Sequence, residues 1–187
     1  MGRVIVGLSG FAGVGKDEAR TVMCVEAGFI GDAFAARLRI LALFLDPYFP
    51  EASDWYSHLI ARFGYDTAKR EYRCIREYLI KLGDGGRRIL CPEVWRDAVL
   101  PPSTSAAYAA FMANPQPLVI SDVRYPNEAL RIKEMGGKVI RITRPGFFAV
   151  HETEARSLAE TPYDVEIIND GTVEEFRAKV LSVINTL

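Results

Sequence analysis

The stretch from residue 10 to residue 17 reads Gly10-Phe11-Ala12-Gly13-Val14-Gly15-Lys16-Asp17, and it follows the apolar run Val4-Ile5-Val6-Gly7-Leu8. It fits the pattern G-x-x-x-x-G-K, with Asp in place of the usual final Ser or Thr. The apolar run predicts a buried strand, and a helical pattern continues from Lys16 to Ala27. Glycines let successive N–H groups point at one anion, and the dipole of the following helix favours negative charge. We therefore predict that residues 10–17 bind the phosphates of a nucleoside triphosphate, with Lys16 on the outer phosphates.

Two carboxylates are candidate magnesium ligands. Asp17 stands where a hydroxyl normally ligates the metal, and a carboxylate could do so directly or through water. Its alternative role is an acidic residue favoured by the helix dipole. Asp122 ends the apolar strand 118–121. Because the carboxyl ends of parallel strands share one crevice, we expect Asp122 near the phosphate loop, holding a magnesium-bound water or orienting the acceptor; alternatively it caps the next helix.

Three arginines lie near the carboxyl ends of predicted strands. Arg124 lies between strand 118–121 and a helix that begins at Pro126, so it is placed to neutralise phosphoryl charge in a transition state. An ion pair with a neighbouring carboxylate is the alternative. Arg144 follows the next strand and is predicted to lie in a lid over the phosphates. Arg141, within that strand, could belong either to the same lid or to a solvated face of the strand.

The remaining pattern predicts an α/β fold. Strands at 29–30, 118–121, 138–143 and 165–168 alternate with helices, which together with strand 4–8 indicates a five-stranded parallel sheet covered on both faces. A chain of 187 residues favours a single domain over residues 1–187.

A stretch within this frame, residues 46–115, is helical in pattern and without a convincing strand, which indicates an insertion. Gly83-Asp84-Gly85-Gly86 predicts a loop inside it. An acceptor that carries a phosphate needs a guanidinium clamp, and the arginines of this insertion are the candidates.

The composition limits the classes of molecule that the protein is expected to bind. The formal net charge is −1, so no basic field draws the protein to nucleic acid or to an anionic membrane. The three cysteines and two histidines have no zinc-site spacing and indicate reduced thiols in a reducing compartment. No apolar run suits a signal peptide or a membrane span. We expect a soluble, cytoplasmic protein whose partners are small-molecule nucleotides; a homodimer stays open.

Five sets of residues are informative together: Leu8-Ser9-Gly10 with Gly13-Val14-Gly15-Lys16-Asp17, Ile120-Ser121-Asp122-Val123-Arg124-Tyr125-Pro126-Asn127-Glu128, Gly136-Gly137-Lys138-Val139-Ile140-Arg141 with Arg144-Pro145, His151-Glu152-Thr153-Glu154 and Ile168-Asn169-Asp170-Gly171-Thr172. They resemble the phage-type deoxynucleoside monophosphate kinases of the P-loop NMP-kinase superfamily. The order and spacing of the matches hold across nearly the whole chain, and only the middle departs: the family often reads Leu-Gln-x-Leu-Gly-Thr and then Gly-Arg, where this chain has Leu79-Ile80-Lys81-Leu82-Gly83-Asp84 and then Gly86-Arg87. The base preference is therefore not predicted.

The resemblance implies a three-layer NMP-kinase fold with sheet order 2-3-1-4-5, ATP as donor, Mg²⁺ as cofactor and a 2′-deoxynucleoside 5′-monophosphate as acceptor. A phage protein of this kind acts in the cytoplasm of the bacterial host. The residues implied in catalysis are Lys16, Asp122, Arg124 and Arg144. For acceptor binding, the resemblance points to Asp32, Phe34, Arg37 and Trp95. The other acceptor-binding candidates are Arg76, Arg87 and Arg88 of the insertion, and Glu128.

Three other functions remain compatible with the sequence. A dephospho-CoA kinase shares the loop and the fold but phosphorylates a ribose hydroxyl. A kinase of hydroxymethylated pyrimidines within DNA would need several phosphate contacts, and the near-neutral charge argues against it. A P-loop module that binds ATP without transferring phosphate to a small acceptor belongs to a different class.

Overall fold

The computed structural model describes residues 3–149 and 152–186. They form two compact units, of which the first comprises the chain up to Phe34 and from Val99 onward, and the second comprises Ala35–Ala98. We call them the sheet unit and the helical unit. The predicted insertion at 46–115 extends further along the sequence than the helical unit, which ends at Ala98, because helix α7 (Ala106–Ala113) belongs to the sheet unit. Within the described ranges, no helix combines the length and apolarity needed to cross a bilayer.

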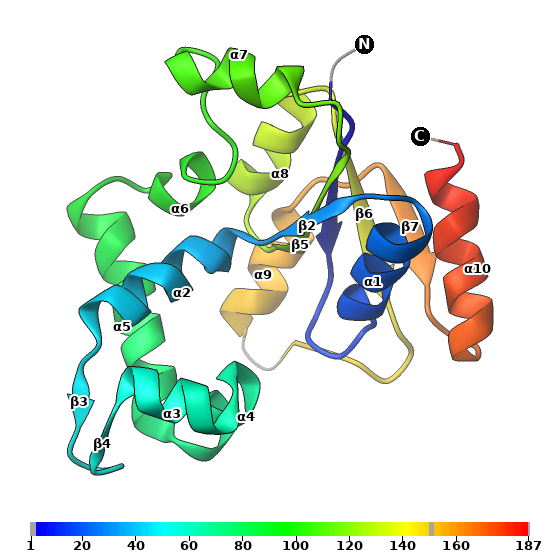
Figure 1. The fold of residues 1–187 in the computed structure, drawn as a ribbon. Helices are drawn as coiled ribbons and strands as arrows, with labels where there is room; N and C mark the ends of the chain where they lie inside the picture. Colours follow the sequence, from blue (N-terminus) through cyan, green and yellow to red (C-terminus); the bar gives the residue numbers. More distant parts are fainter. Residues whose placement is uncertain (1–2, 150–151, 187) are drawn as a thin grey trace. The chain divides into compact units, whose positions relative to one another are not determined.

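A parallel sheet organises the sheet unit (Figure 1). Its strand order is β2-β5-β1-β6-β7, and every pair of neighbours is parallel. Numbered among these strands alone, that order is 2-3-1-4-5, so the predicted sheet is confirmed. The strands are β1 (Ile5–Ser9), β2 (Ile30–Asp32), β5 (Leu118–Val123), β6 (Lys138–Thr143) and β7 (Val165–Ile168).

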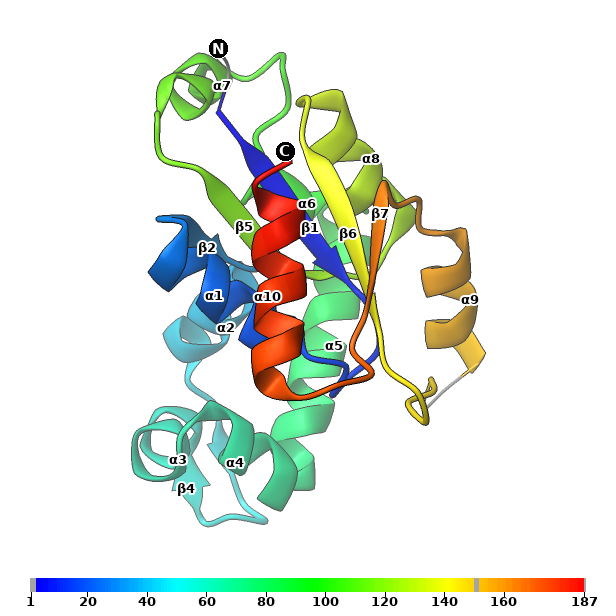
Figure 2. The same ribbon diagram turned by 90° about the vertical axis from the view of Figure 1, so that its right-hand side faces the viewer.

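Helices cover both faces of this sheet, which is why the central strand β1 is buried along its whole length. One apolar cluster joins β1, β5 and β6 to helices α1 (Lys16–Glu26) and α10 (Val173–Ile184), through residues such as Leu8, Met23 and Phe176. A second cluster on the other face joins the same strands to α8 (Pro126–Glu134) and α7. Figure 2 shows α1 and α10 side by side over one face. Helix α9 (Glu152–Glu160) leads into β7.

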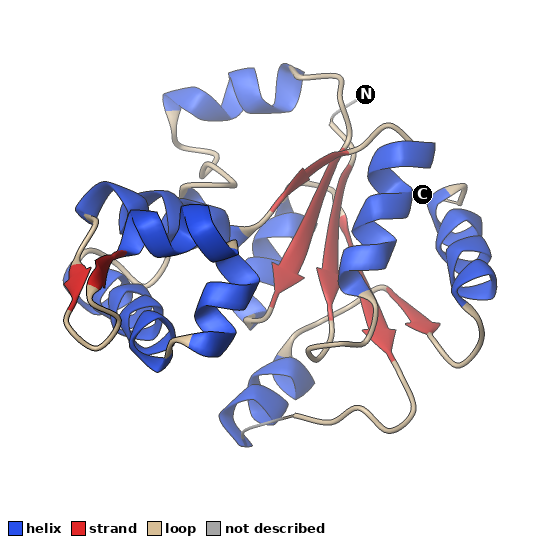
Figure 3. Cartoon of the chain, turned by 60° about the horizontal axis from the view of Figure 1, so that its bottom comes forward, coloured by secondary structure: helices blue, strands red, loops and turns tan. Residues whose placement is uncertain are grey.

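The helical unit has a core of its own. Tyr56, Leu59, Ile75 and Leu79 are buried there, and burial raises the pKa of Tyr56 to about 12. A two-stranded hairpin, visible beside the helices in Figure 3, was not predicted, because each strand has only two residues. The elements are α2 (Phe34–Leu45), which starts in the sheet unit, then β3 (Tyr48–Phe49), β4 (Asp54–Trp55), α3 (Tyr56–Phe63), α4 (Tyr65–Glu71), α5 (Arg73–Ile89) and α6 (Val94–Asp97).

The loop predicted at Gly83–Gly86 is wrong, because these residues lie inside helix α5. Trp95 of α6 packs on this glycine-rich turn, and its Nε1 donates a hydrogen bond to the carbonyl oxygen of Gly83 at 3.0 Å. A Cβ at Gly86 would lie 2.5 Å from the indole ring. Glycine in a helix costs up to about 1 kcal/mol relative to alanine. Burial of the indole, which is 7% exposed, offsets that cost here.

Two neighbouring substitutions in α5 test this packing. Gly85→Ala is expected to stabilise the protein by up to about 1 kcal/mol, since nothing lies within 4 Å of the added Cβ and alanine is the better helix former. Gly86→Ala is expected to destabilise it by about 1–3 kcal/mol, because the new methyl group overlaps Trp95. Urea denaturation of both variants gives the two free energies of unfolding; equal changes would contradict the packing described.

Candidate active site

The loop between β1 and α1 has the conformation that only glycine adopts readily. Gly10, Gly13 and Gly15 have φ angles of 142°, 79° and 113°, in the region that other residues avoid. A Cβ at Gly10 would overlap the carbonyl oxygen of Ile142 in the adjacent strand β6. The loop is therefore closely packed on the sheet as well as tightly wound.

Lys16 ends the loop and begins α1. Its Nζ donates hydrogen bonds to the carbonyl oxygens of Gly10 at 2.7 Å and Phe11 at 2.6 Å, which holds the ammonium group against the loop. Gly15 is the N-cap of α1 and supplies no side-chain acceptor, and the first N–H groups of a helix have no acceptor within it. Positive charge from the ammonium, the amides and the helix dipole thus gathers at one place, which suits a polyphosphate.

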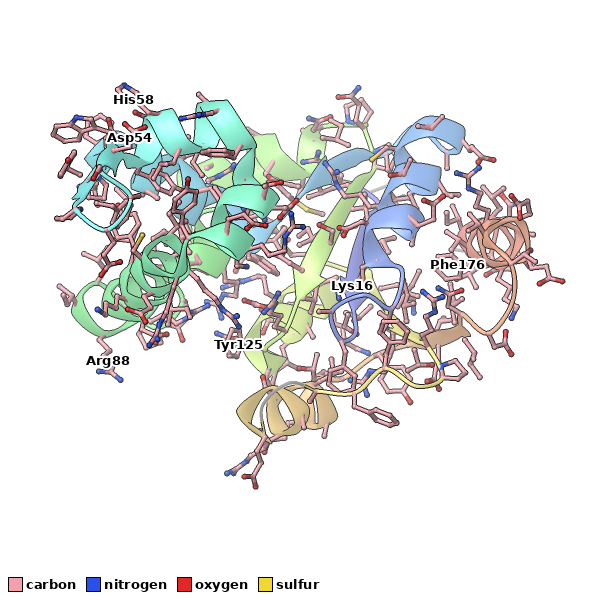
Figure 4. All side chains as sticks on the ribbon, turned by 90° about the horizontal axis from the view of Figure 1, so that it is seen from below. Lys16, Asp54, His58, Arg88, Tyr125 and Phe176 are labelled. Carbon is pink, nitrogen blue, oxygen red and sulfur yellow. The ribbon has the colours of Figure 1, made fainter. Side chains whose placement is uncertain are left out.

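Residues from the end of the chain support this loop. The side-chain amide of Asn169 donates a hydrogen bond to the carbonyl oxygen of Val14 at 2.9 Å. A Cβ at Gly15 would lie 2.8 Å from that amide nitrogen and 3.1 Å from the ring of Phe176. Figure 4 labels Lys16, where the loop enters α1, and Phe176 on α10. Asn169 lay within a run that resembles the kinase family, but nothing in the sequence indicated its contact with the loop.

Asp122 makes a contact that neither sequence interpretation anticipated. Its Oδ1 accepts a hydrogen bond from the main-chain N–H of Phe34, the first residue of α2, at 2.7 Å. The carboxylate therefore joins the end of β5 to the start of α2, where Oδ1 of Asp32 also accepts the N–H of Ala33 at 2.8 Å. Asp17 is exposed in the first turn of α1.

Arg124 lies in the turn between β5 and α8, and its side chain is exposed. The carboxylate of Glu128, 4% exposed, accepts the main-chain N–H groups of Arg124 at 2.8 Å and of Tyr125 at 3.1 Å. Figure 4 labels Tyr125. Glu128 is thus the capping residue of α8 and fixes the backbone that carries Arg124.

The two arginines of β6 and the loop after it have different environments. Arg144 is exposed, with its guanidinium carbon 4.8 Å from the ring centroid of Phe147, and Phe147 in turn packs against Gly13 of the phosphate loop. Arg141 is not on a solvated face, because its Nη2 donates to the carbonyl oxygens of Leu158 and Thr161. Burial lowers the pKa of Arg141 from its ordinary value.

The acceptor-site candidates are divided between the two units. In the sheet unit, Phe34 is in the core, and Asp32 and Glu128 hold backbone N–H groups. In the helical unit, Arg76 and Arg88 are exposed on α5. Arg88 is labelled in Figure 4.

The remaining candidates of the helical unit have internal contacts. Arg87 Nη1 lies 3.8 Å from Asp84 Oδ1, and Arg37 Nε donates to the carbonyl oxygen of Ala98 at 3.4 Å. Trp95 is buried on α5, so its indole supports that helix. His151, from the run that resembles the kinase family, lies outside the described residues.

Comparisons with known proteins point to kinases. Over 198 residues the chain is 29% identical to the "Putative deoxynucleotide monophosphate kinase" of Acanthamoeba polyphaga mimivirus, covering 97% of this chain and 96% of that protein. It is 27% identical over 183 residues to the "Uncharacterized protein ORF76" of Ictalurid herpesvirus 1, covering 95% of this chain but 65% of that protein. No protein-family model matches the chain.

The fold has a counterpart among solved structures. The crystal structure of a "putative kinase" from Chloroflexus aurantiacus superposes with a TM-score of 0.51 and 11% identity, covering 98% of this chain and 95% of that one. The α/β architecture, the parallel sheet and the loop between β1 and α1 are those of a P-loop kinase fold.

Proposed function

We propose that this protein transfers the γ-phosphoryl group of ATP to a deoxynucleoside 5′-monophosphate and so forms a diphosphate for DNA synthesis. The observation that carries the proposal is the loop of residues 10–17, with the Lys16 ammonium held on its carbonyl oxygens at the start of α1. The full-length similarity to a mimivirus protein named as a deoxynucleotide monophosphate kinase supports the choice of acceptor. The viral origin of both curated relatives supports a role in the cytoplasm of an infected host cell.

The reaction needs charge neutralisation more than it needs a base, because donor and acceptor are both phosphates. The amides of residues 10–17 and the ammonium of Lys16 would bind the donor phosphates. Arg124 and Arg144 are the guanidinium groups that we assign to the transferring phosphoryl group. Exposure of both side chains leaves them accessible to a ligand.

Mg²⁺ fits the side chains available. It is usually bound by one or two carboxylates together with phosphate oxygens and water, and Asp17 and Asp122 are such a pair. Among the described residues, no group of three or more metal-binding side chains occurs. When bound, Mg²⁺ would reduce the negative charge of the donor phosphates. Oδ1 of Asp122 accepts the N–H of Phe34, and we assign Asp122 to a metal-bound water.

Acceptor recognition is assigned to the side chains that the sequence indicated for it. Arg37, Arg76, Arg87 and Arg88 supply the positive charge for the acceptor phosphate. Asp32 stands at the end of β2, beside the start of α2. Phe34, Trp95 and Glu128 are buried and would act on the acceptor through the segments that they hold in place.

An acceptor panel tests the proposal. The protein is incubated with ATP, Mg²⁺ and each of dAMP, dGMP, dCMP and dTMP, and ADP and the deoxynucleoside diphosphate are quantified by ion-exchange chromatography. We expect both products to form in equal amounts with at least one of these acceptors. Dephospho-CoA, DNA with hydroxymethylated pyrimidines and buffer alone are the comparison reactions. Transfer to dephospho-CoA or DNA alone, acceptor-independent ADP formation, or ATP binding without ADP would each contradict the proposal.

A further inference from the structure

The backbone of Arg124 is fixed from both sides. Its N–H donates to the buried carboxylate of Glu128 at 2.8 Å. Its carbonyl oxygen accepts a hydrogen bond from the hydroxyl of Ser157 in α9 at 2.7 Å. Ser157 lies far from Arg124 in the sequence, and no motif described above includes it. The turn that carries the exposed side chain of Arg124 is thus held by hydrogen bonds at both the N–H and the carbonyl oxygen of this residue.

Ser157 is the main donor to this carbonyl. Thr161 also lies within reach, with its Oγ1 at 3.2 Å from the carbonyl oxygen of Arg124 and at 2.8 Å from that of Ser157. The Thr161 hydroxyl has one hydrogen to donate, and its shorter contact, to the carbonyl oxygen of Ser157, is the better hydrogen bond. Thr161 therefore serves mainly its own helix end.

The position of Ser157 is itself set by the sheet. Arg141 of β6 donates through Nη2 to the carbonyl oxygens of Leu158 and, at 2.7 Å, Thr161, at the end of α9 where the helix dipole favours a cation. Its guanidinium carbon lies 4.2 Å from the ring centroid of Tyr163. Arg141 pairs in register with Ser9, the last residue before the phosphate loop. The contacts thus run from the strand beside that loop, through α9, to Arg124.

We propose that Ser157 is a positioning residue for phosphoryl transfer, acting through Arg124. The inference rests on the proposed function, in which the guanidinium of Arg124 neutralises the transferring group. Such an electrostatic contribution depends on a donor that is already in place, and small displacements of a reacting group reduce rates steeply. With the carbonyl of Arg124 fixed by Ser157, the side chain starts from a defined backbone position.

The test compares three substitutions in α9. Ser157→Ala is expected to lower kcat about fivefold to tenfold, the effect of one lost hydrogen bond, with the KM for ATP unchanged. Ser157→Thr retains a hydroxyl and is expected to restore most of kcat. Arg156→Ala is the matched control, because Arg156 is 81% exposed and pairs with Glu160 on the same helix; it is expected to leave kcat unchanged. Melting temperatures report any loss of fold.

A double-mutant cycle with Arg124→Ala separates positioning from a general structural role. If Ser157 acts through Arg124, Ser157→Ala causes no further loss of kcat in the Arg124→Ala background. The same loss in both backgrounds, or no loss in either, overturns the inference while the proposed function stands. If the unsubstituted protein transfers phosphate to no deoxynucleoside monophosphate, the proposed function fails first and the inference fails with it.

Discussion

Replacing Lys16 by alanine is expected to lower the rate of phosphoryl transfer by about 10³-fold. The substitution removes the ammonium group that the fold holds on the carbonyl oxygens of Gly10 and Phe11. A fixed charge directed at the transferring group typically contributes a factor of about 10²–10³, and Lys16 in addition joins two carbonyls of the loop that carries the amides. Steady-state kinetics with ATP, Mg²⁺ and the best acceptor gives the ratio of rates.

Lys138→Ala is the control for this experiment. Lys138 is an exposed lysine at the amino end of β6, whereas the phosphate loop follows the carboxyl end of β1, so its loss is expected to leave transfer unchanged. A calorimetric titration with ATP and Mg²⁺ then shows whether Lys16→Ala also weakens binding. Full transfer by a folded Lys16→Ala variant would remove the loop from the proposed mechanism.

Gly10→Ala is expected to destabilise the protein by about 3 kcal/mol and to abolish ATP binding. The φ angle of 142° strains any residue with a Cβ, at a cost of about 1–3 kcal/mol. The added methyl group also overlaps the main-chain oxygen of Ile142, and a central strand cannot move aside as a flexible side chain does. Overpacking of this kind costs about 1–3 kcal/mol more. Urea denaturation and calorimetry with ATP measure the two effects.

Gly136→Ala isolates the conformational part of that cost. Gly136 has a φ angle of 78°, but nothing lies within 4 Å of an added Cβ. It is expected to destabilise the protein by about 1–2 kcal/mol and to leave ATP binding intact, since it precedes β6 at the opposite end of the sheet from the loop. Equal losses of stability in Gly10→Ala and Gly136→Ala would show that the contact with Ile142 is not what fixes the loop.

Continuous apolar sequence made the sheet predictable. Strands β1 and β5 contain β-branched or aliphatic runs that suit a strand buried on both faces. The predicted positions of β1, β5, β6 and β7 agree with the structure to within two residues. The loop of residues 10–17 was equally predictable, because glycine spacing and a following lysine are local features. Local pattern and tertiary structure agree for these elements.

Tertiary contacts explain what the sequence pattern missed. The glycines at 83–86 predict a loop because the sequence pattern carries no sign of Trp95, the side chain against which Gly86 must be small. Asn169 and Val14 are 155 positions apart, and Ser157 and Arg124 are 33 apart. A single polar residue that bonds a distant carbonyl leaves no periodic signal. Glu128 belongs to a motif and is predicted from the sequence to bind the acceptor, but its capping bonds to Arg124 and Tyr125 were not predicted.

The support of the phosphate loop by Asn169 and Phe176 also has a consequence for biosynthesis. Ribosomes synthesise a chain from its amino end at about 5–20 residues per second, so residues 35–98 can fold while translation continues. The phosphate loop emerges before Asn169 and Phe176, from which it receives its last contacts. We expect that nascent chains stalled before residue 169 bind no ATP, which a pull-down of arrested ribosomes on immobilised nucleotide would check. Unfinished copies would then consume none of the cell's ATP.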